Sequence, residues 1–238
     1  MRLVRVPLHG LAAGERVLAA ASAHYVTGVL RLAPGARFIA FDPDTHLEAE
    51  AEVLDATRIR IAELTPGRVV ADAPLAIVYA LAKGDKIDAT IRDATELGAT
   101  RIVLAETARS VVKATERIEK KRERWQRIVE EAARQCGRSD PPTVEGPLPW
   151  REALAAVTAD SAYCLDPRAT EPLGATLPTA VAGRSAIAFA IGPEGGLTED
   201  EIRAADDAGF RPVTLGPFVL RTETVTAAVL GAVRILRG

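Results

Sequence analysis

The sequence predicts an α/β protein in which a small β-rich unit precedes a domain built on a parallel sheet. Residues 1–72 contain several short strand-like segments and one short helix. From residue 73 onward, apolar strands alternate with amphipathic helices, and strand–helix–strand units of this kind form parallel sheets. A chain of 238 residues is long enough for one large domain or two small ones. We therefore predict two domains, 1–72 and 73–238.

The N-terminal unit reads as a small barrel of short strands. The stretch Glu48–Leu54 alternates imperfectly between apolar and polar residues, as antiparallel strands do. Pro34-Gly35 and Pro66-Gly67 are turn signals, and Ser22 is the expected N-cap of the short helix. The expected strands are Leu3–Pro7, Arg16–Ala19, Arg37–Phe41, Leu47–Asp55 and Arg58–Leu64.

The second domain opens with a clear βαβ unit. Leu75–Leu81 is a continuous apolar run, and Gly84–Leu97 has one apolar helical face that ends at Gly98. Arg101–Ala105 is the next strand. The same alternation then continues, with Ser139–Pro149 expected to be a proline-rich loop. Further expected helices are Thr115–Cys136, Trp150–Thr158, Glu199–Ala208 and Thr222–Leu236, and further expected strands are Ala162–Leu165, Ala186–Ile191 and Arg211–Leu215.

Three of these strands end in loops that we expect to lie side by side: Asp166–Arg168, Gly192–Gly196 and Gly216–Arg221. Open parallel sheets bind their ligands outside the carboxyl ends of the strands. The sequence therefore predicts a ligand site at this edge of the sheet.

The glycine-rich loop is followed by signals of a helix start. Thr198 stands three residues before a glutamate, which is the spacing of a capping box. Such a turn often binds phosphate, but Glu194 and the acidic first helical turn would repel an anion, and neither phosphate-loop spacing is present. A neutral or cationic ligand fits better. The alternative is a tight turn that needs positive φ at Gly195 and Gly196.

Composition excludes several classes of protein. No apolar run approaches the ~20 residues of a membrane-spanning helix, and the N-terminus lacks a signal-peptide core, so we expect a cytoplasmic protein with no membrane contact. Cys136 and Cys164 give no disulfide framework. The histidines His9, His24 and His46 stand at no metal-ligand spacing, and we expect no metal.

The net charge of −2 conceals an uneven distribution of charge along the chain. Residues 101–138 hold 11 basic and 6 acidic side chains, whereas residues 139–238 hold 8 and 13. A local basic surface suits nucleic acid. The basic residues of the helix Thr115–Cys136 are interleaved with acids, however, so a solvated helix is the alternative.

Two segments, IGPEGGLTEDE at 191–201 and LGPFVLRTETVTAAVL at 215–230, together resemble the RsmE family. That family consists of 16S ribosomal RNA uridine N3-methyltransferases of the SPOUT superfamily, which use S-adenosylmethionine. Residues 24–42, 81–102, 106–112 and 130–139 are similar to further segments of the family in the expected order. The resemblance therefore covers nearly the whole chain.

The resemblance implies features of fold and assembly that periodicity alone does not predict. Residues 1–72 would form a PUA-like β-barrel that helps to bind RNA, and residues 73–238 a SPOUT-type parallel sheet with a C-terminal trefoil knot, a rare feature that no local pattern predicts. It further implies a homodimer that acts on 16S ribosomal RNA in the small ribosomal subunit.

The implied S-adenosylmethionine site uses the three strand-end loops and the last helix, and the acidity of the glycine loop suits a cationic cofactor. The expected cofactor contacts are Leu165, Asp166, Ile191, Gly192, Pro193, Glu194, Gly195, Gly196, Leu215, Gly216, Leu220, Thr224 and Ala227.

For catalysis, we expect Arg221 to stabilise the negative charge that develops on the uracil, or to bind a phosphate. Glu223 is the carboxylate candidate for a base; alternatively, it is a helix-start acid that favours the helix dipole. The candidate RNA contacts are Arg2, Arg5, Arg31, Lys83, Arg109 and Arg138.

Two other functions stay open. A SPOUT ribose 2′-O-methyltransferase has a related glycine motif, but that branch typically ends in a serine–leucine–asparagine run, whereas this chain has Leu220-Arg221-Thr222-Glu223-Thr224. A non-catalytic RNA-binding protein could keep the fold, and it would bind no cofactor.

Overall fold

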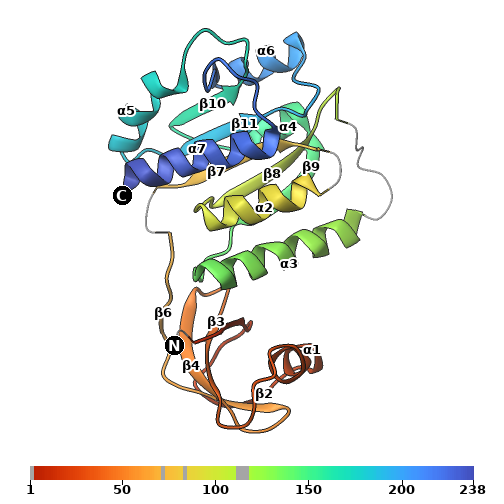
Figure 1. Cartoon of the computed structure of the whole chain (residues 1–238), viewed down its shortest axis with the longest axis vertical. Coiled ribbons are helices and arrows are strands. Elements are labelled where there is room, and N and C mark those ends of the chain that lie inside the picture. Colours follow the sequence, from red (N-terminus) through yellow and green to blue (C-terminus); the bar gives the residue numbers. More distant parts are fainter. Residues whose placement is uncertain (1–2, 71–72, 83–84, 111–117) are drawn as a thin grey trace. The chain divides into compact units, whose positions relative to one another are not determined.

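The computed structural model describes residues 3–70, 73–82, 85–110 and 118–238 (Figure 1). The chain forms two compact units. One contains Met1–Val70 and Glu130–Pro141, and the other contains Ala71–Val129 and Pro142–Gly238. The predicted start of one helix at Gly84 and the predicted residues 115–117 of another lie outside the described residues. Among the described residues, we find no helix that is both long enough and apolar enough to span a bilayer.

The N-terminal unit is built on a mixed sheet of order β1-β3-β4-β5-β2, with β6 paired to β4. β1 runs parallel to β3, and the other pairs are antiparallel. Ala49, Ala51 and Val53 of β4 point into the core, so the predicted alternation is present. The strands are β1 (Arg5–Pro7), β2 (Gly14–Val17), β3 (Arg37–Phe41), β4 (Leu47–Val53), β5 (Arg58–Ile61) and β6 (Thr65–Pro66).

The short helix of this unit differs from its prediction. It begins as α1 (Ala20–Ala23) with Ala19 at the N-cap, and it continues as a π-helical segment, His24–Val29. The prediction that Ser22 caps this helix was wrong, because Ser22 lies inside α1. Val26, which is fully buried, belongs to the core of the N-terminal unit.

The second unit contains a six-stranded sheet of order β12-β10-β11-β7-β8-β9 in which every pair is parallel. The predicted α/β class with a parallel sheet is confirmed. The register fixes the faces: Ile77 and Tyr79 point to one side, and Ala76 and Val78 to the other. The strands are β7 (Leu75–Ala80), β8 (Arg101–Glu106), β9 (Thr143–Pro149), β10 (Ser161–Leu165), β11 (Ile187–Ile191) and β12 (Phe210–Val213).

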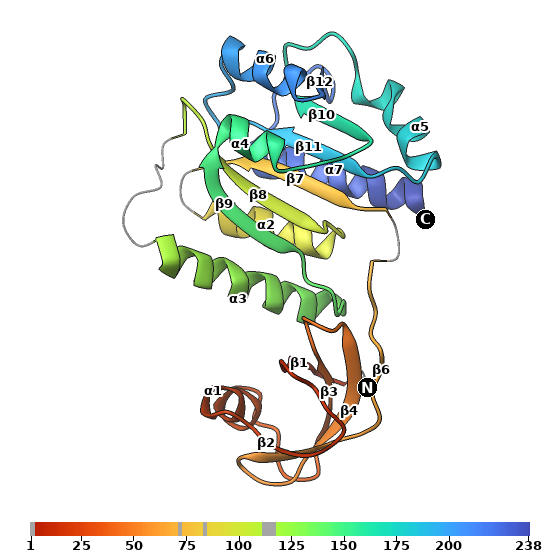
Figure 2. The ribbon, with the colours of Figure 1, turned by 180° about the vertical axis from the view of Figure 1, so that it is seen from behind.

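Helices cover both faces of this sheet, as the two opposite views show (Figures 1 and 2). On one face lie α2 (Lys86–Glu96), α5 (Leu177–Ala182) and α7 (Thr222–Arg237), joined by Trp125 and Val129 of α3 (Ile118–Cys136). α2 and α7 pack against each other. On the other face lie α4 (Trp150–Ala155) and α6 (Glu199–Asp207). The buried strands are apolar on both sides for this reason.

Two stretches in which no helix or strand was predicted form regular structure. Ser139–Pro149 contains β9, which pairs with β8 at the edge of the sheet. An edge strand tolerates proline because it needs ladder hydrogen bonds on one side only. Leu177–Ala182 forms α5, and a proline in its first turn is compatible with a helix start.

Candidate functional site

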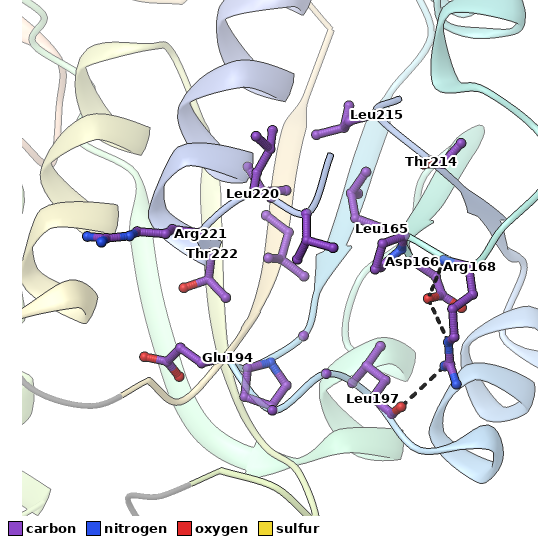
Figure 3. A pocket seen from close by; sticks show the side chains of 18 of the residues that line it. Leu165, Asp166, Arg168, Glu194, Leu197, Thr214, Leu215, Leu220, Arg221 and Thr222 are labelled. Carbon is purple, nitrogen blue, oxygen red and sulfur yellow. Dashed lines mark hydrogen bonds and ion pairs between the residues drawn. The ribbon is translucent and has the colours of Figure 1, made fainter. Parts of the chain in front are cut away.

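The loops after β10, β11 and β12 enclose a pocket of about 520 Å³ (Figure 3). β10 lies between β11 and β12, so the carboxyl ends of these three strands adjoin. The expectation that the three loops lie side by side is confirmed. The volume falls in the range of small-molecule sites, roughly 300–1,000 Å³.

The pocket brings together many of the residues expected to contact a cofactor. The pocket is lined by Leu165, Asp166, Ile191–Gly196, Leu215 and Leu220, and by the predicted catalytic residue Arg221. Four predicted site residues are near these segments of the chain but do not line the pocket: Gly216, Glu223, Thr224 and Ala227. The other lining residues were not individually predicted as contacts, although some lie in the predicted loops; they are Lys86, Pro167, Arg168, Leu197, Val213, Thr214, Phe218, Val219, Thr222 and Val225. Most of them adjoin a predicted position; Lys86 comes from a distant helix.

The glycines of the loop after β11 serve two different purposes. Gly196 has φ +72° and donates its N–H to the carbonyl of Pro193 at 2.8 Å, which closes a tight turn. Gly192 and Gly195 have no positive φ, so the alternative that Gly195 needs one was wrong. A Cβ on Gly192 would lie 2.8 Å from Leu197 Cγ, and a Cβ on Gly195 would lie 3.2 Å from Arg109 Cβ. These two positions therefore require close approach rather than an unusual backbone.

The predicted capping box at the start of α6 is present. Thr198 Oγ1 accepts the N–H of Glu201 at 3.2 Å, and Glu201 Oε2 accepts the N–H of Thr198 at 2.8 Å. The other oxygen of Glu201 accepts the N–H of Ala108 at 2.7 Å. One side chain thus caps α6 and attaches the loop after β8 to it.

Arg168 joins the loop after β10 to the loop after β11 (Figure 3). Its guanidinium donates to Asp166 Oδ1 at 3.1 Å, to Glu199 Oε1 at 2.7 Å and to the carbonyl of Leu197 at 3.3 Å. The hydrogen bond that Arg168 donates to Asp166 is the main reason that the pKa of Arg168 is raised. The two loops are therefore held together by charge as well as by the sheet.

An ionic cluster lies where α2, α7 and the glycine loop meet. Lys86 Nζ is 3.0 Å from Glu194 Oε1 and 3.6 Å from Glu223 Oε2. Thr222 Oγ1 donates to Glu223 Oε2 at 3.2 Å. The pKa of Glu223 is lowered, first by its own backbone N–H and further by Lys86. The pKa of Lys86 is raised, chiefly by its hydrogen bond to Glu194.

The candidate RNA contacts have diverse surroundings. Arg109 lines the pocket, and Arg31 is exposed with φ 54°. Arg5 is mostly buried in the N-terminal unit and pairs with Glu48 at 2.8 Å, and Arg138 is 5% exposed and pairs with Asp140 at 3.1 Å. Their guanidinium groups are engaged within the unit. Arg2 and Lys83 lie outside the described residues.

The histidine His9 has acidic neighbours that its position in the sequence did not indicate. Its Nδ1 lies 2.8 Å from Asp44 Oδ2, and this hydrogen bond raises the pKa of His9. Asp42 is nearby, but its carboxylate accepts the backbone N–H groups of Leu11 and Asp44. The group therefore combines a buried carboxylate, Asp42, with two exposed side chains, His9 and Asp44. Both cysteines are free thiols.

Comparisons with known proteins agree with the fold and the pocket. Residues 71–234 match the model of the RNA methyltransferase domain family. The ribosomal RNA small subunit methyltransferase E of Synechocystis sp. is 34% identical over 223 residues, which are 92% of this chain and 72% of that protein. The Bacillus subtilis protein of the same name is 31% identical over 234 residues, covering 90% and 89%.

Two solved structures match over nearly their whole length. One is a ribosomal RNA small subunit methyltransferase E from Neisseria gonorrhoeae bound to S-adenosyl methionine, with a TM-score of 0.85, 30% identity and coverage of 99% and 98%. The other is a Legionella pneumophila protein in complex with the cofactor SAM, with a TM-score of 0.89, 26% identity and the same coverage. This chain therefore belongs to the ribosomal RNA small subunit methyltransferase E family, the RsmE family that its motifs resemble.

Proposed function

We propose that this chain methylates N3 of a specific uridine in the 16S ribosomal RNA of the small subunit, with S-adenosylmethionine as the methyl donor. The observation that carries the proposal is the pocket at the ends of β10, β11 and β12, in a member of a family whose relative is solved with this cofactor bound. When bound, S-adenosylmethionine supplies an electrophilic methyl group on its sulfonium.

The lining residues fit such a cofactor. Leu165, Ile191 and Leu215 offer apolar surface to an adenine ring, while the backbone of Gly192–Gly196 is accessible to polar groups. The acidic Glu194 suits a ligand that carries a sulfonium and an ammonium group. Two of the four basic side chains that line the pocket, Arg168 and Lys86, are paired with acids, which reduces the positive charge available to a phosphate.

Arg221 is the residue to which we assign a role in the reaction, and Glu223 is the candidate base to be weighed beside it. Arg221 lines the pocket at the start of α7, where its guanidinium would stabilise the negative charge that develops on the uracil (Figure 3). Glu223 stays ionised at neutral pH because its pKa is lowered. A lowered pKa makes a carboxylate a weaker proton acceptor, which favours the helix-start role of Glu223 over the role of base.

The remaining proposals concern the assembly. We assign residues 1–72 to a PUA-like barrel that binds RNA and residues 73–238 to a SPOUT domain with a C-terminal trefoil knot, acting as a cytoplasmic homodimer. The mixed sheet of the N-terminal unit supports the first assignment. Phe218 and Val219 support the dimer, because they are 79% and 81% exposed at the rim of the pocket, where a second subunit would cover them.

Separate assays of binding and methylation test this function. We expect the chain to bind S-adenosylmethionine in calorimetry and to methylate small-subunit RNA at uridine N3, as read by mass spectrometry of the digested RNA. Arg221→Ala should bind the cofactor and lose methylation, whereas Arg151→Ala, on α4, should behave as the parent. A methyl group on the ribose 2′-oxygen would replace the proposal with its nearest rival, and absence of cofactor binding would indicate a non-catalytic RNA-binding protein.

A further inference from the structure

The ammonium group of Lys86 lies between two carboxylates that come from distant parts of the chain. Glu194 belongs to the glycine loop after β11, and Glu223 belongs to the first turn of α7. All three side chains are only partly exposed, at 30%, 33% and 25%. Partial burial makes such ion pairs more effective than those on an open surface.

The position of Lys86 in its own helix is unfavourable. It is the first residue of α2, where the positive end of the helix dipole disfavours a cation. The two carboxylates compensate for this repulsion. A residue that breaks a local rule and lines the pocket is a candidate for a role in the site.

Glu223 is in turn fixed from the side of the sheet. Tyr79 lies on β7 with its hydroxyl 2.9 Å from Thr222 Oγ1, and both side chains are buried. Thr222 donates its single proton to Glu223, so Tyr79 donates to Thr222. A directional series of hydrogen bonds therefore runs from the core to Glu223, and the two ion pairs of Lys86 connect Glu223 to Glu194.

We propose that Lys86 is a positioning residue of the cofactor site: its ammonium group holds Glu194 of the glycine loop to Glu223 of α7. This inference rests on the proposed function, because the loop and the start of α7 form two sides of the pocket. Lys86 acts through Glu194 and takes no part in the transfer of the methyl group. Without it, the two carboxylates repel each other and the glycine loop loses its attachment to α7.

The test is a double-mutant cycle on the full chain, read by calorimetry with S-adenosylmethionine as the probe. Lys86→Met should weaken binding by about tenfold, and Lys86→Arg should stay within about threefold of the parent because it keeps the charge. In a Glu194→Gln background, Lys86→Met should cost only about threefold more, because the pair is already broken. Arg92→Met, on the exposed side of α2, is the matched control and should bind as the parent does.

Each outcome has a distinct meaning. If the parent chain binds no cofactor, the proposed function fails before Lys86 is tested. If the parent and Lys86→Met bind the cofactor equally well, the inference is overturned. It is also overturned if the affinity losses of Lys86→Met and Glu194→Gln multiply in the double variant, because Lys86 then does not act through Glu194. Thermal unfolding checks that the variants are folded. Should Lys86→Met unfold, Glu194→Gln and Lys86→Arg decide: the inference requires that the first lose affinity and the second keep it.

Discussion

Nη1 of Arg109 donates a hydrogen bond of 2.9 Å to the carbonyl oxygen of Gly195. The side chain of Arg109 also lies over this glycine, since a Cβ on Gly195 would be 3.2 Å from Arg109 Cβ. Arg109 is also a predicted RNA contact. Its contacts connect the loop after β8 to the glycine loop, and the hydrogen bond that Ala108 donates to Glu201 attaches the same loop to α6. Arg109 therefore has a defined place in the wall of the pocket.

Arg109→Ala should weaken the binding of S-adenosylmethionine by about threefold to tenfold, because one hydrogen bond that orders the glycine loop is worth about 0.5–1.5 kcal/mol. Calorimetry measures this loss. Arg127→Ala is the control, since the guanidinium of Arg127 contacts the Glu123 carbonyl of its own helix. Unchanged cofactor affinity together with weaker RNA binding would restore Arg109 as an RNA contact.

Gly192→Ala should lower both the affinity for the cofactor and the stability of the fold, because the new methyl group would overpack the loop. The loss of stability should be about 1–3 kcal/mol. The methyl group would lie 2.8 Å from Cγ of Leu197, whose side chain is buried in the core cluster on one face of the sheet and has little room to move. Urea unfolding and calorimetry measure the two effects. In Gly174→Ala, the added Cβ meets no described atom within 4 Å, so the change should stay within about 0.5 kcal/mol. Equal behaviour of the two variants would contradict this account.

Glu48→Gln should destabilise the N-terminal unit by about 2 kcal/mol, because it leaves the Arg5 guanidinium in a site only 10% exposed without its anion. Arg5 also donates to Ser139 Oγ at 2.7 Å and lies 5.0 Å above the Phe41 ring. Glu50→Gln, on the same strand, breaks an exposed pair and should cost only about 0.5 kcal/mol. If chemical unfolding shows the same small loss for both, Arg5 is not held in place and returns as a candidate RNA contact.

Stability at acid pH should depend on Glu145. Its hydrogen bond from Arg101 lowers the pKa of the carboxyl below its ordinary value of 4.5. A carboxyl with a lowered folded-state pKa stabilises the protein above its unfolded value and loses that contribution as pH falls through the folded value. The parent should therefore exceed Glu145→Gln in stability at pH 7, and the difference should shrink below pH 4.5. Chemical unfolding measured at a series of pH values checks this, and a difference that stays constant from pH 7 to pH 3 would contradict it.

The sequence predicted most elements of the fold because their signals are local. The capping box at Thr198 and the apolar runs of β7 and β11 depend on residues a few positions apart. The predictions failed where a local signal conflicted with tertiary context. β9 has prolines and reads as a loop, yet the exposed edge of β8 accepts it as a strand.

The candidate site could be predicted in outline. Apolar strands that end in glycine or charged loops gave the positions of Leu165, Gly192 and Leu215 at the mouth of one pocket. Lys86 was missed because it stands at the start of a helix, where nothing in the neighbouring residues indicates a binding partner. Arg138 is a predicted RNA contact, and its neighbours in the sequence do not indicate that it is buried beside Asp140.

By itself, the sequence determined the class of fold, the order of its elements, the loop with its capped helix and the family to which the chain belongs. Hydrophobic periodicity and motifs of adjacent residues indicate these features. Only the tertiary structure decided which side chains meet: Tyr79 with Thr222, 143 positions apart, Arg5 with Ser139, 134 positions apart, and Lys86 with two glutamates. The physical reason is that hydrogen bonds and ion pairs act over a few ångströms in space, and such distances arise only when the sheet and the packing of α2 against α7 have brought the segments together.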